Sequence, residues 1–349
     1  MTSLYPLSHG VRTFNDRLPA AATTLAERYR DAGYATLGLS SVLFSGQFTN
    51  LHQGFEELHE SGSASTPGPK TAREYVDRVA AWLEHHRDVP FFIYLHVFDP
   101  HDPYEPYRPY DALWADPGHK EEHEAQLDAV REIIDDPLRR NFGRTLIVFT
   151  SDHGEEFLDH GRMFHGQTVY GELTWVPLVV RWPGHIAAGG VIEEPIQLID
   201  IMPTLVDVSG LAPVDEMQGQ SLVPLLGAGD PTGWIARPAF SEKAITDDTF
   251  SPPPRDTESY AVTDDAWKLI HNRVRPEGAP EFELFDARDD PLDMTNLADS
   301  RPDIVERLAR EIERWQRVAE TERLPDDAES TEGLTQEQLE RLRSLEYIR

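Results

Sequence analysis

The sequence predicts an α/β protein with a mainly parallel central sheet flanked by helices, followed by a smaller C-terminal antiparallel sheet plus helix. Helical patterns alternate with short apolar runs three times before residue 150. Such alternation is typical of a parallel sheet covered on both faces. After residue 227 the pattern changes to short, turn-bounded segments, which are typical of small antiparallel sheets. We therefore predict a catalytic domain over 1–226 and a C-terminal subdomain over 227–349.

The first helix-strand unit has signals at both ends of its helix. Thr24 and Glu27 have capping-box spacing, and Gly33 stands where a C-terminal cap is expected. Residues 34–40 then have the composition of a strand.

The second unit repeats this pattern with Thr71 and Glu74, followed by the apolar stretch 91–98. A charged helical pattern over 120–140 leads to a third strand at 145–149. Three successive units of this kind predict parallel strands.

Further elements follow the third strand. A second buried run is predicted over 176–182, and Pro203 suits the first turn of a short helix that starts near Asp200. In the C-terminal part, apolar residues recur at helical spacing on one face, at Ile304, Leu308, Ile312 and Trp315.

Composition excludes several classes of function. The net charge is -30, from 62 acidic and 32 basic residues, which argues against nucleic acid as a partner. No apolar run is long enough to span a membrane. The absence of cysteine excludes disulfides and thiolate metal sites. The first residues have no apolar signal core, so we expect a cytoplasmic protein. Oligomeric state cannot be read from the sequence.

The balance of charges also suggests the environment of the protein. Only four of the 32 basic residues are lysine, while carboxylates are abundant. High salt screens the repulsion within such a surface. We therefore hypothesise a halophilic, haloarchaeal protein.

Polar residues gather at the end of the third strand, where α/β enzymes place their chemistry. Asp152 and His153 are adjacent there, and a strand exit lets the backbone turn both side chains toward one point, as a divalent metal requires. An ordinary surface turn remains the alternative for this pair alone. Two further histidines, His160 and His165, are each followed by glycine, which favours a functional site.

These residues resemble a known family. SDHGEEF, followed by HG and then by VPLVVRWPG, is similar to the sulfatases of the alkaline phosphatase superfamily. The resemblance implies an alkaline-phosphatase-like sandwich in which Asp152 and His153 bind the active-site metal. It also implies that His165, at a position where relatives keep a lysine or histidine, contacts the sulfate or phosphate of the substrate.

Two other segments take part in the resemblance. The loop DPHDPYEPY resembles the family's H-x-x-x-PH-x-PY, which implies that His101 contacts the ester and protonates the leaving oxygen. Asn15 matches a family asparagine that touches the substrate, although a turn residue is the alternative reading on sequence alone.

The chain departs from the family pattern at its beginning. TSLYPLSHG resembles the segment that follows the family's C-x-P-S-R motif, whose cysteine or serine becomes the formylglycine nucleophile. That motif and the acidic metal ligands of the first strand would lie upstream of Met1. Either the true protein is longer, or the chain is a truncated paralogue. The G-K-W-H signature of many arylsulfatases also has no match, which puts substrate contacts carried over from arylsulfatases in doubt.

The resemblance implies a sulfatase-like hydrolase that cleaves small-molecule or saccharide sulfate esters with one divalent metal, calcium by expectation. An alternative is a phosphodiesterase, phosphonate monoester hydrolase or phosphoglycerol transferase of the same superfamily, in which Mn²⁺ or Zn²⁺ is expected. A second alternative is a non-catalytic paralogue that binds a sulfated or phosphorylated ligand. Without its nucleophile, the printed chain is expected to be inactive toward sulfate esters.

Overall fold

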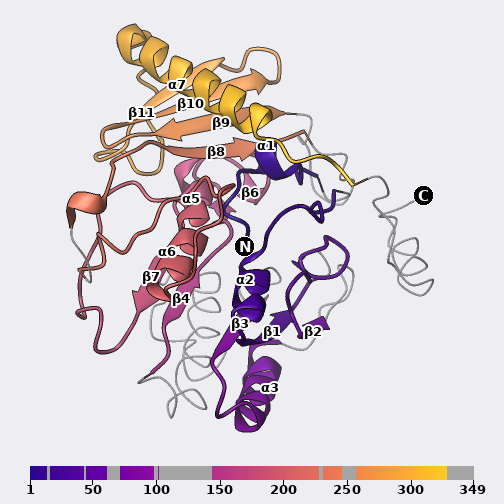
Figure 1. Cartoon of the computed structure of the whole chain (residues 1–349). Helices are drawn as coiled ribbons and strands as arrows, with labels where there is room; N and C mark the ends of the chain where they lie inside the picture. Colours follow the sequence, from indigo (N-terminus) through magenta and orange to yellow (C-terminus); the bar gives the residue numbers. More distant parts are fainter. Residues whose placement is uncertain are drawn as a thin grey trace, which may run out of the picture. The chain divides into compact units, whose positions relative to one another are not determined.

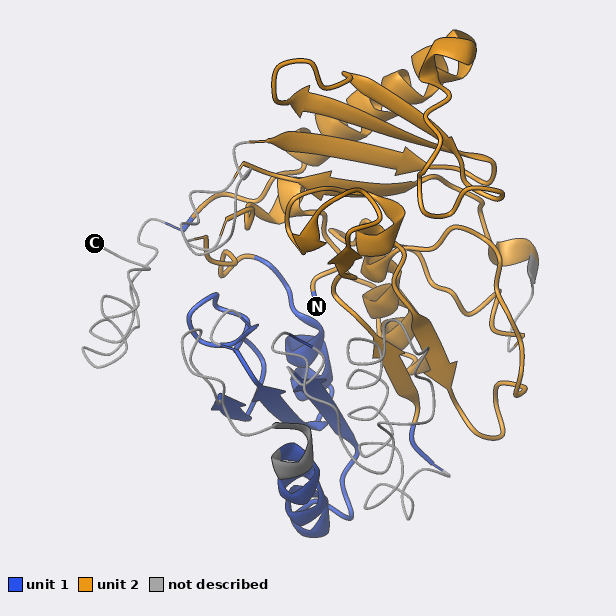
Figure 2. Ribbon diagram, turned by 180° about the vertical axis from the view of Figure 1, so that it is seen from behind, with its two compact units in different colours: residues 1, 22–145, 327–349 blue, residues 2–21, 146–326 orange. Residues whose placement is uncertain are grey.

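The computed structural model describes residues 1–13, 16–42, 45–60, 71–97, 101, 144–227, 231–245 and 257–327. These residues belong to two compact units (Figure 2). The first unit contains Met1, 22–145 and 327–349, and the second contains 2–21 and 146–326. The predicted boundary between 226 and 227 stays a prediction. No helix in the described ranges is long and apolar enough to cross a membrane.

The first unit is built on a three-stranded parallel sheet in the order β2-β1-β3. Its strands and helices are α2 (Leu25–Asp31), β1 (Ala35–Ser40), β2 (Glu57–Glu60), α3 (Thr71–His85) and β3 (Phe91–His96). The central strand β1 is buried along its whole length. The parallel arrangement predicted from the first two helix-strand units is confirmed, whereas β2 was not predicted and lies at one edge of the sheet. The helix predicted over 120–140 lies outside the described residues, and the predicted third strand is found in an antiparallel pair of the second unit.

The signals of the first predicted helix behave as expected, whereas the side chains of Thr71 and Glu74 lie outside the described ones. Thr24 Oγ1 accepts the Glu27 N–H, and the Glu27 carboxylate accepts the Thr24 N–H, so both halves of the capping box form. Gly33 follows the end of α2 with a φ of +84°, a left-handed conformation that favours glycine. The buried face of α3 includes Tyr75 and Val79, which pack on β1 and β3.

The second unit contains the predicted C-terminal antiparallel sheet, in the order β11-β10-β9-β8. Its members are β8 (Ala239–Lys243), β9 (Glu258–Thr263), β10 (Trp267–Val274) and β11 (Phe282–Asp286), and α7 (Pro302–Thr321) lies across one face (Figure 1). Leu308, Ile312 and Trp315 of α7 are buried, as their spacing predicted. On this face they pack against Tyr260 and Val262 of β9.

The opposite face of the same sheet packs on the segment that follows the candidate site. Because side chains alternate along a strand, Ala261 and Ile270 point away from α7. They form a smaller cluster with Val169 and Phe285, and Tyr170 packs against it. The sheet is therefore buried on both faces, and one of them supports residues 169–170.

The remaining elements of the second unit are short. They are α1 (Pro6–His9), β4 (Ile147–Thr150), β5 (Glu156–Phe157), β6 (Met163–Phe164), α5 (Gly171–Thr174), β7 (Leu178–Arg181), the 3₁₀ turn η4 (Leu198–Asp200) and α6 (Ile201–Val208), with shorter 3₁₀ turns at 231–233 and 298–300. The helix predicted near Asp200 is confirmed by η4 and α6. Two-stranded antiparallel pairs form between β4 and β7 and between β5 and β6.

One expectation for this region was wrong. Residues 176–182 were predicted as a buried run, but β7 alternates between half-buried and exposed positions, and Val179 is 54% exposed. An apolar strand is buried on both sides only where other segments pack on both faces of its sheet. The described part of the unit covers β7 on one face only.

Candidate active site

The site begins where β4 ends. After Thr150 the chain turns sharply, and Ser151 Oγ donates a 2.5 Å hydrogen bond to the carbonyl of His153. This turn brings Asp152 Oδ2 within 3.7 Å of His153 Nε2, and the His153 N–H donates to Asp152 Oδ1 at 3.0 Å. The two adjacent side chains therefore face one another, which is the geometry that the strand exit predicted.

The hydrogen bonds of His153 suit a metal ligand. Its Nδ1 lies 2.8 Å from the carbonyl oxygen of Gly154. Only a protonated Nδ1 can donate to a carbonyl, so the neutral ring keeps its lone pair on Nε2, the nitrogen near Asp152. Metal-binding histidines are commonly oriented by such a bond from the other ring nitrogen. Asp152 is 70% and His153 41% exposed, so both side chains can be reached from solvent.

Asp152 and His153 supply two donors that fit one cation. Within the ranges that the structure describes, no group of three or more His, Asp or Glu side chains is placed to hold a metal.

His165 joins this pair. Its ring stacks on that of His153, with centroids 4.3 Å apart and planes 27° from parallel. Its Nδ1 lies 3.1 Å from Glu155 Oε1, a carboxylate with little exposure. Positive φ angles at Phe164 and Gly166 show that the backbone turns on both sides of His165. The structure thus brings together Asp152, His153 and His165.

The structure does not test the other two predicted site residues. His101 belongs to the first unit, and the two units are described separately. Asn15 lies outside the described residues. Their roles stay predictions.

Gly154 allows the loop to lie against α5. Its N–H donates to the carbonyl of Leu173 at 2.9 Å, and the Glu155 N–H donates to the carbonyl of Glu172 at 3.1 Å. A Cβ on Gly154 would lie 1.9 Å from the Glu172 carbonyl oxygen, far inside contact distance. The glycine of the DHG sequence is therefore required by close backbone approach.

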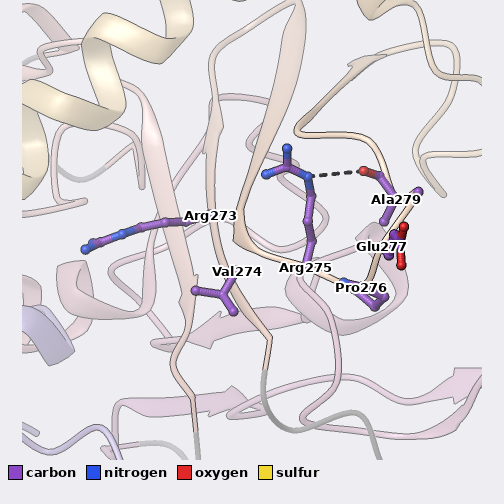
Figure 3. Close-up of a pocket in the computed structure, with 7 residues that line it drawn as sticks. Arg273, Val274, Arg275, Pro276, Glu277 and Ala279 are labelled. Atoms are coloured by element: carbon purple, nitrogen blue, oxygen red, sulfur yellow. Dashed lines mark hydrogen bonds between the residues drawn. The ribbon is translucent and has the colours of Figure 1, made fainter.

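A hollow elsewhere in the second unit does not belong to this site. It has a volume of about 430 Å³ and is lined by Arg273–Ala279, the loop between β10 and β11 (Figure 3). Arg275 Nε donates to the carbonyl of Ala279 at 3.1 Å across it. It shares no residue with the group around His153 and is formed by a single loop, so we do not assign it a substrate.

Comparison with known proteins identifies the family. The family model described as Sulfatase matches residues 1–211, more than half of the chain. The chain belongs to the sulfatase family. A second family model, described as N-sulphoglucosamine sulphohydrolase, C-terminal, matches residues 159–318. The resemblance found in the SDHGEEF segment is thereby confirmed.

Curated relatives of this sulfatase-family chain match about half of it. Arylsulfatase K of Xenopus laevis is 31% identical over 173 residues, which are 49% of this chain and 31% of the relative. The multifunctional alkaline phosphatase superfamily protein PehA of Trinickia caryophylli is 33% identical over 184 residues, which are 47% of this chain and 34% of the relative. The chain thus spans about a third of the length of these relatives.

Solved structures confirm the predicted fold class. A protein solved in complex with its substrate D-glucosamine-2-N,6-O-disulfate superimposes with a TM-score of 0.73 at 18% identity, covering 94% of this chain and 88% of the other. The phosphonate monoester hydrolase of Agrobacterium radiobacter gives 0.70 at 22% identity, covering 91% and 84%. At these identities the likeness concerns the fold.

Proposed function

We propose that this chain supplies metal-binding and substrate-binding groups of a sulfuric ester hydrolase. The observation that carries the proposal is the grouping of Asp152, His153 and His165 at the end of β4 in a chain of the sulfatase family. A carboxylate and an imidazole beside a second imidazole suit an anionic ester that is held on a cation.

The metal is proposed to be a divalent cation, calcium by preference. Asp152 would bind it through a carboxylate oxygen and His153 through Nε2, because Nδ1 of His153 is engaged with Gly154. The family resemblance implies further carboxylate ligands for the same cation. When bound, such a cation polarises the ester and positions the nucleophile.

The histidines have separate proposed roles. His165 would donate to the transferred sulfuryl group, with Glu155 on its Nδ1 orienting the ring. His101 would protonate the leaving oxygen, and Asn15 would touch the substrate, both on the strength of the family resemblance. A positioned acid of this kind contributes on the order of 10²- to 10⁴-fold to a rate.

The proposed substrate is a small-molecule or saccharide sulfate ester. A structural neighbour was solved with the sulfated saccharide D-glucosamine-2-N,6-O-disulfate, and another is described as a 2-O GAG sulfatase. These descriptions support the substrate class without selecting a sugar. The acidic composition, with 62 carboxylates, argues against nucleic acid as the ester.

Phosphoryl chemistry is the second candidate. It is favoured by the 33% identity to PehA and by the likeness to phosphonate monoester hydrolases. Mn²⁺ or Zn²⁺ would then take the place of calcium. A third candidate is a protein that binds a sulfated or phosphorylated ligand without turnover. Such a protein needs only the groups around His153.

Activity is tested in a chain extended upstream in its natural reading frame. Aryl sulfate and aryl phosphate turnover are compared with Ca²⁺, Mn²⁺ and Zn²⁺. Faster sulfate cleavage supports the proposal, and faster phosphate cleavage supports the second candidate. His165→Ala should lower turnover on the order of 10²- to 10⁴-fold. His185→Ala, which alters a ring that stacks on Trp182, is the control.

The 349-residue chain is tested by calcium titration calorimetry. Binding that is lost in Asp152→Ala supports the cation site, and an absence of calcium, manganese and zinc binding contradicts it. Binding of an aryl sulfate without turnover in both the printed and the extended chain would favour the binding protein.

A further inference from the structure

His160 lies between two acceptors that come from different parts of the second unit. It follows β5, seven residues after His153. Its Nδ1 is 2.6 Å from Glu172 Oε1, and its Nε2 is 2.9 Å from the carbonyl oxygen of Asp293. A neutral imidazole carries one N–H, whereas both nitrogens here face acceptors, so the geometry fits the imidazolium form. Tyr170 stacks on the ring, with centroids 3.8 Å apart and planes 8° from parallel, which suits a cation.

The first acceptor is part of the helix that supports the metal-binding loop. Glu172 lies in α5, and its backbone carbonyl accepts the N–H of Glu155, while the carbonyl of Leu173 accepts the N–H of Gly154. The side chain of Glu172 thus holds His160 while its main chain holds the residues that follow Asp152 and His153. Moving Glu172 would move this loop.

The second acceptor is tied to the same short helix. The carboxylate of Asp293 accepts the N–H of Gly171 at 2.8 Å and forms a 2.5 Å ion pair with Lys268 of β10. Lys268 also donates to Thr174 Oγ1 at 3.2 Å. Asp293 and Lys268 are 2% and 7% exposed at their side chains, so this pair is shielded from water. Both ends of α5 are therefore fixed to the C-terminal sheet.

We propose that His160 is a positioning residue that clamps α5 to the Asp293 turn and thereby fixes the loop carrying Asp152 and His153. It deepens the proposed function, because only that function makes the two side chains metal ligands. His160 itself touches none of the reacting atoms. Its effect passes through Glu172 to the backbone of Gly154 and Glu155.

The surrounding charges support the protonated ring. Burial opposes protonation, but the hydrogen bonds to the Asp293 carbonyl and the Glu172 carboxylate outweigh it, so the pKa of His160 is raised above 6.5. The other charged groups near it are Lys268, paired with Asp293, together with Arg162 and Glu156 of the β5–β6 segment. The pKa of Glu156 is itself raised by burial, which lessens its negative charge.

A raised histidine pKa fixes the direction of the pH dependence. The folded state binds the proton more tightly than the unfolded chain does, so the clamp contributes fully below about pH 6.5. It is lost as pH rises through the raised folded value. A purely steric role of the ring would give no such dependence.

The test measures amide hydrogen exchange of Gly154 and Glu155 in the metal-free 349-residue chain. His160→Gln should raise exchange at these amides ~10- to 100-fold, because charge-assisted hydrogen bonds are lost. Exchange at Val262, inside the C-terminal sheet, should stay unchanged. The matched control is His271→Gln, which alters a histidine of the same sheet whose Nε2 lies 3.8 Å from Glu281. Wild-type exchange at Gly154 and Glu155 in the variant would overturn the proposal.

A second variant covers the case in which His160→Gln fails to fold. Glu172→Gln keeps an oxygen acceptor but removes its charge, so His160 should lose its proton at lower pH. The pH at which Gly154 and Glu155 lose protection should fall in this variant, and an unchanged pH would refute the clamp. Calcium titration on the same samples is read separately. If wild type binds no cation, the proposed metal site fails, while the exchange data still decide the clamp.

Discussion

Replacing Gly154 with alanine tests whether the site loop depends on close contact with α5. The new Cβ would lie 1.9 Å from the carbonyl oxygen of Glu172, so the loop and the helix must separate by more than 1 Å to reach ordinary contact near 3.4 Å. Separation weakens the hydrogen bonds from Gly154 to Leu173 and from Glu155 to Glu172. Overpacking of about 1–3 kcal/mol and about 1 kcal/mol for each of the two weakened bonds predict a loss of about 3–5 kcal/mol in unfolding free energy.

The measurement is urea unfolding followed by tryptophan fluorescence, with calcium calorimetry on the same protein. Gly154→Ala should unfold at lower urea and bind calcium more weakly, because Asp152 and His153 precede the displaced residue. The control is Gly190→Ala, where an added Cβ meets nothing within 4 Å and the φ angle is not in the left-handed region. It should be neutral or stabilise by up to ~1 kcal/mol. Equal unfolding midpoints for Gly154→Ala and wild type would refute the close-contact argument.

Three further predictions concern other parts of the chain. Burial raises the pKa of Glu242 to about 7 despite the Arg12 guanidinium 3.4 Å away. A carboxyl raised in this way favours the folded state at low pH, so stability should fall as pH rises from about 4.5 to about 7. In Glu242→Gln, the decrease in unfolding free energy over this pH range should be smaller by roughly 3 kcal/mol. Unfolding titrations at several pH values measure it, and an unchanged pH dependence would contradict the raised pKa of Glu242. Thr24→Ala removes the hydroxyl that accepts the Glu27 N–H and donates to the Gln53 carbonyl, and it should cost about 1 kcal/mol in thermal unfolding, whereas Thr321→Ala, at the last residue of α7, should cost less. With a net charge of -30, the protein should gain stability between low and multimolar KCl, and equal melting temperatures would contradict the halophilic hypothesis.

The fold class could be predicted because its signals are local. The capping box at Thr24 and Glu27 and the helical spacing of Leu308, Ile312 and Trp315 depend on neighbours within a few residues, and the structure contains both. The exposure of β7 could not be predicted in the same way. Its apolar sequence, with Val179 half-exposed, does not tell which segments cover it.

The candidate site likewise has contacts that the local sequence predicts and contacts that it does not. Asp152 and His153 were predicted to converge because a strand exit brings adjacent side chains together, and they do. Glu155 was passed over as a partner of His165, although its place directly after the DHG sequence was a signal. The links from His160 to Glu172 and Asp293 span 12 and 133 residues. The contact with Asp293 joins residues that are far apart in the sequence, so no local sequence pattern indicates it. It forms only once the C-terminal sheet has folded.

The second unit joins chain segments that are synthesised far apart in time. Ser8 accepts hydrogen bonds from Leu324 to its carbonyl, its hydroxyl donates to the carbonyl of Ala319, and the ring of Tyr5 meets that of Trp315 at a centroid distance of 5.2 Å. On a translating ribosome, residues 2–21 must therefore wait for α7 to emerge. At ~5–20 residues per second the 300 or so residues between them take on the order of 15 s or more. During that interval the hydrophobic partners of Tyr5 in α7 do not yet exist, so this unit should not become protease-resistant before α7 has been synthesised.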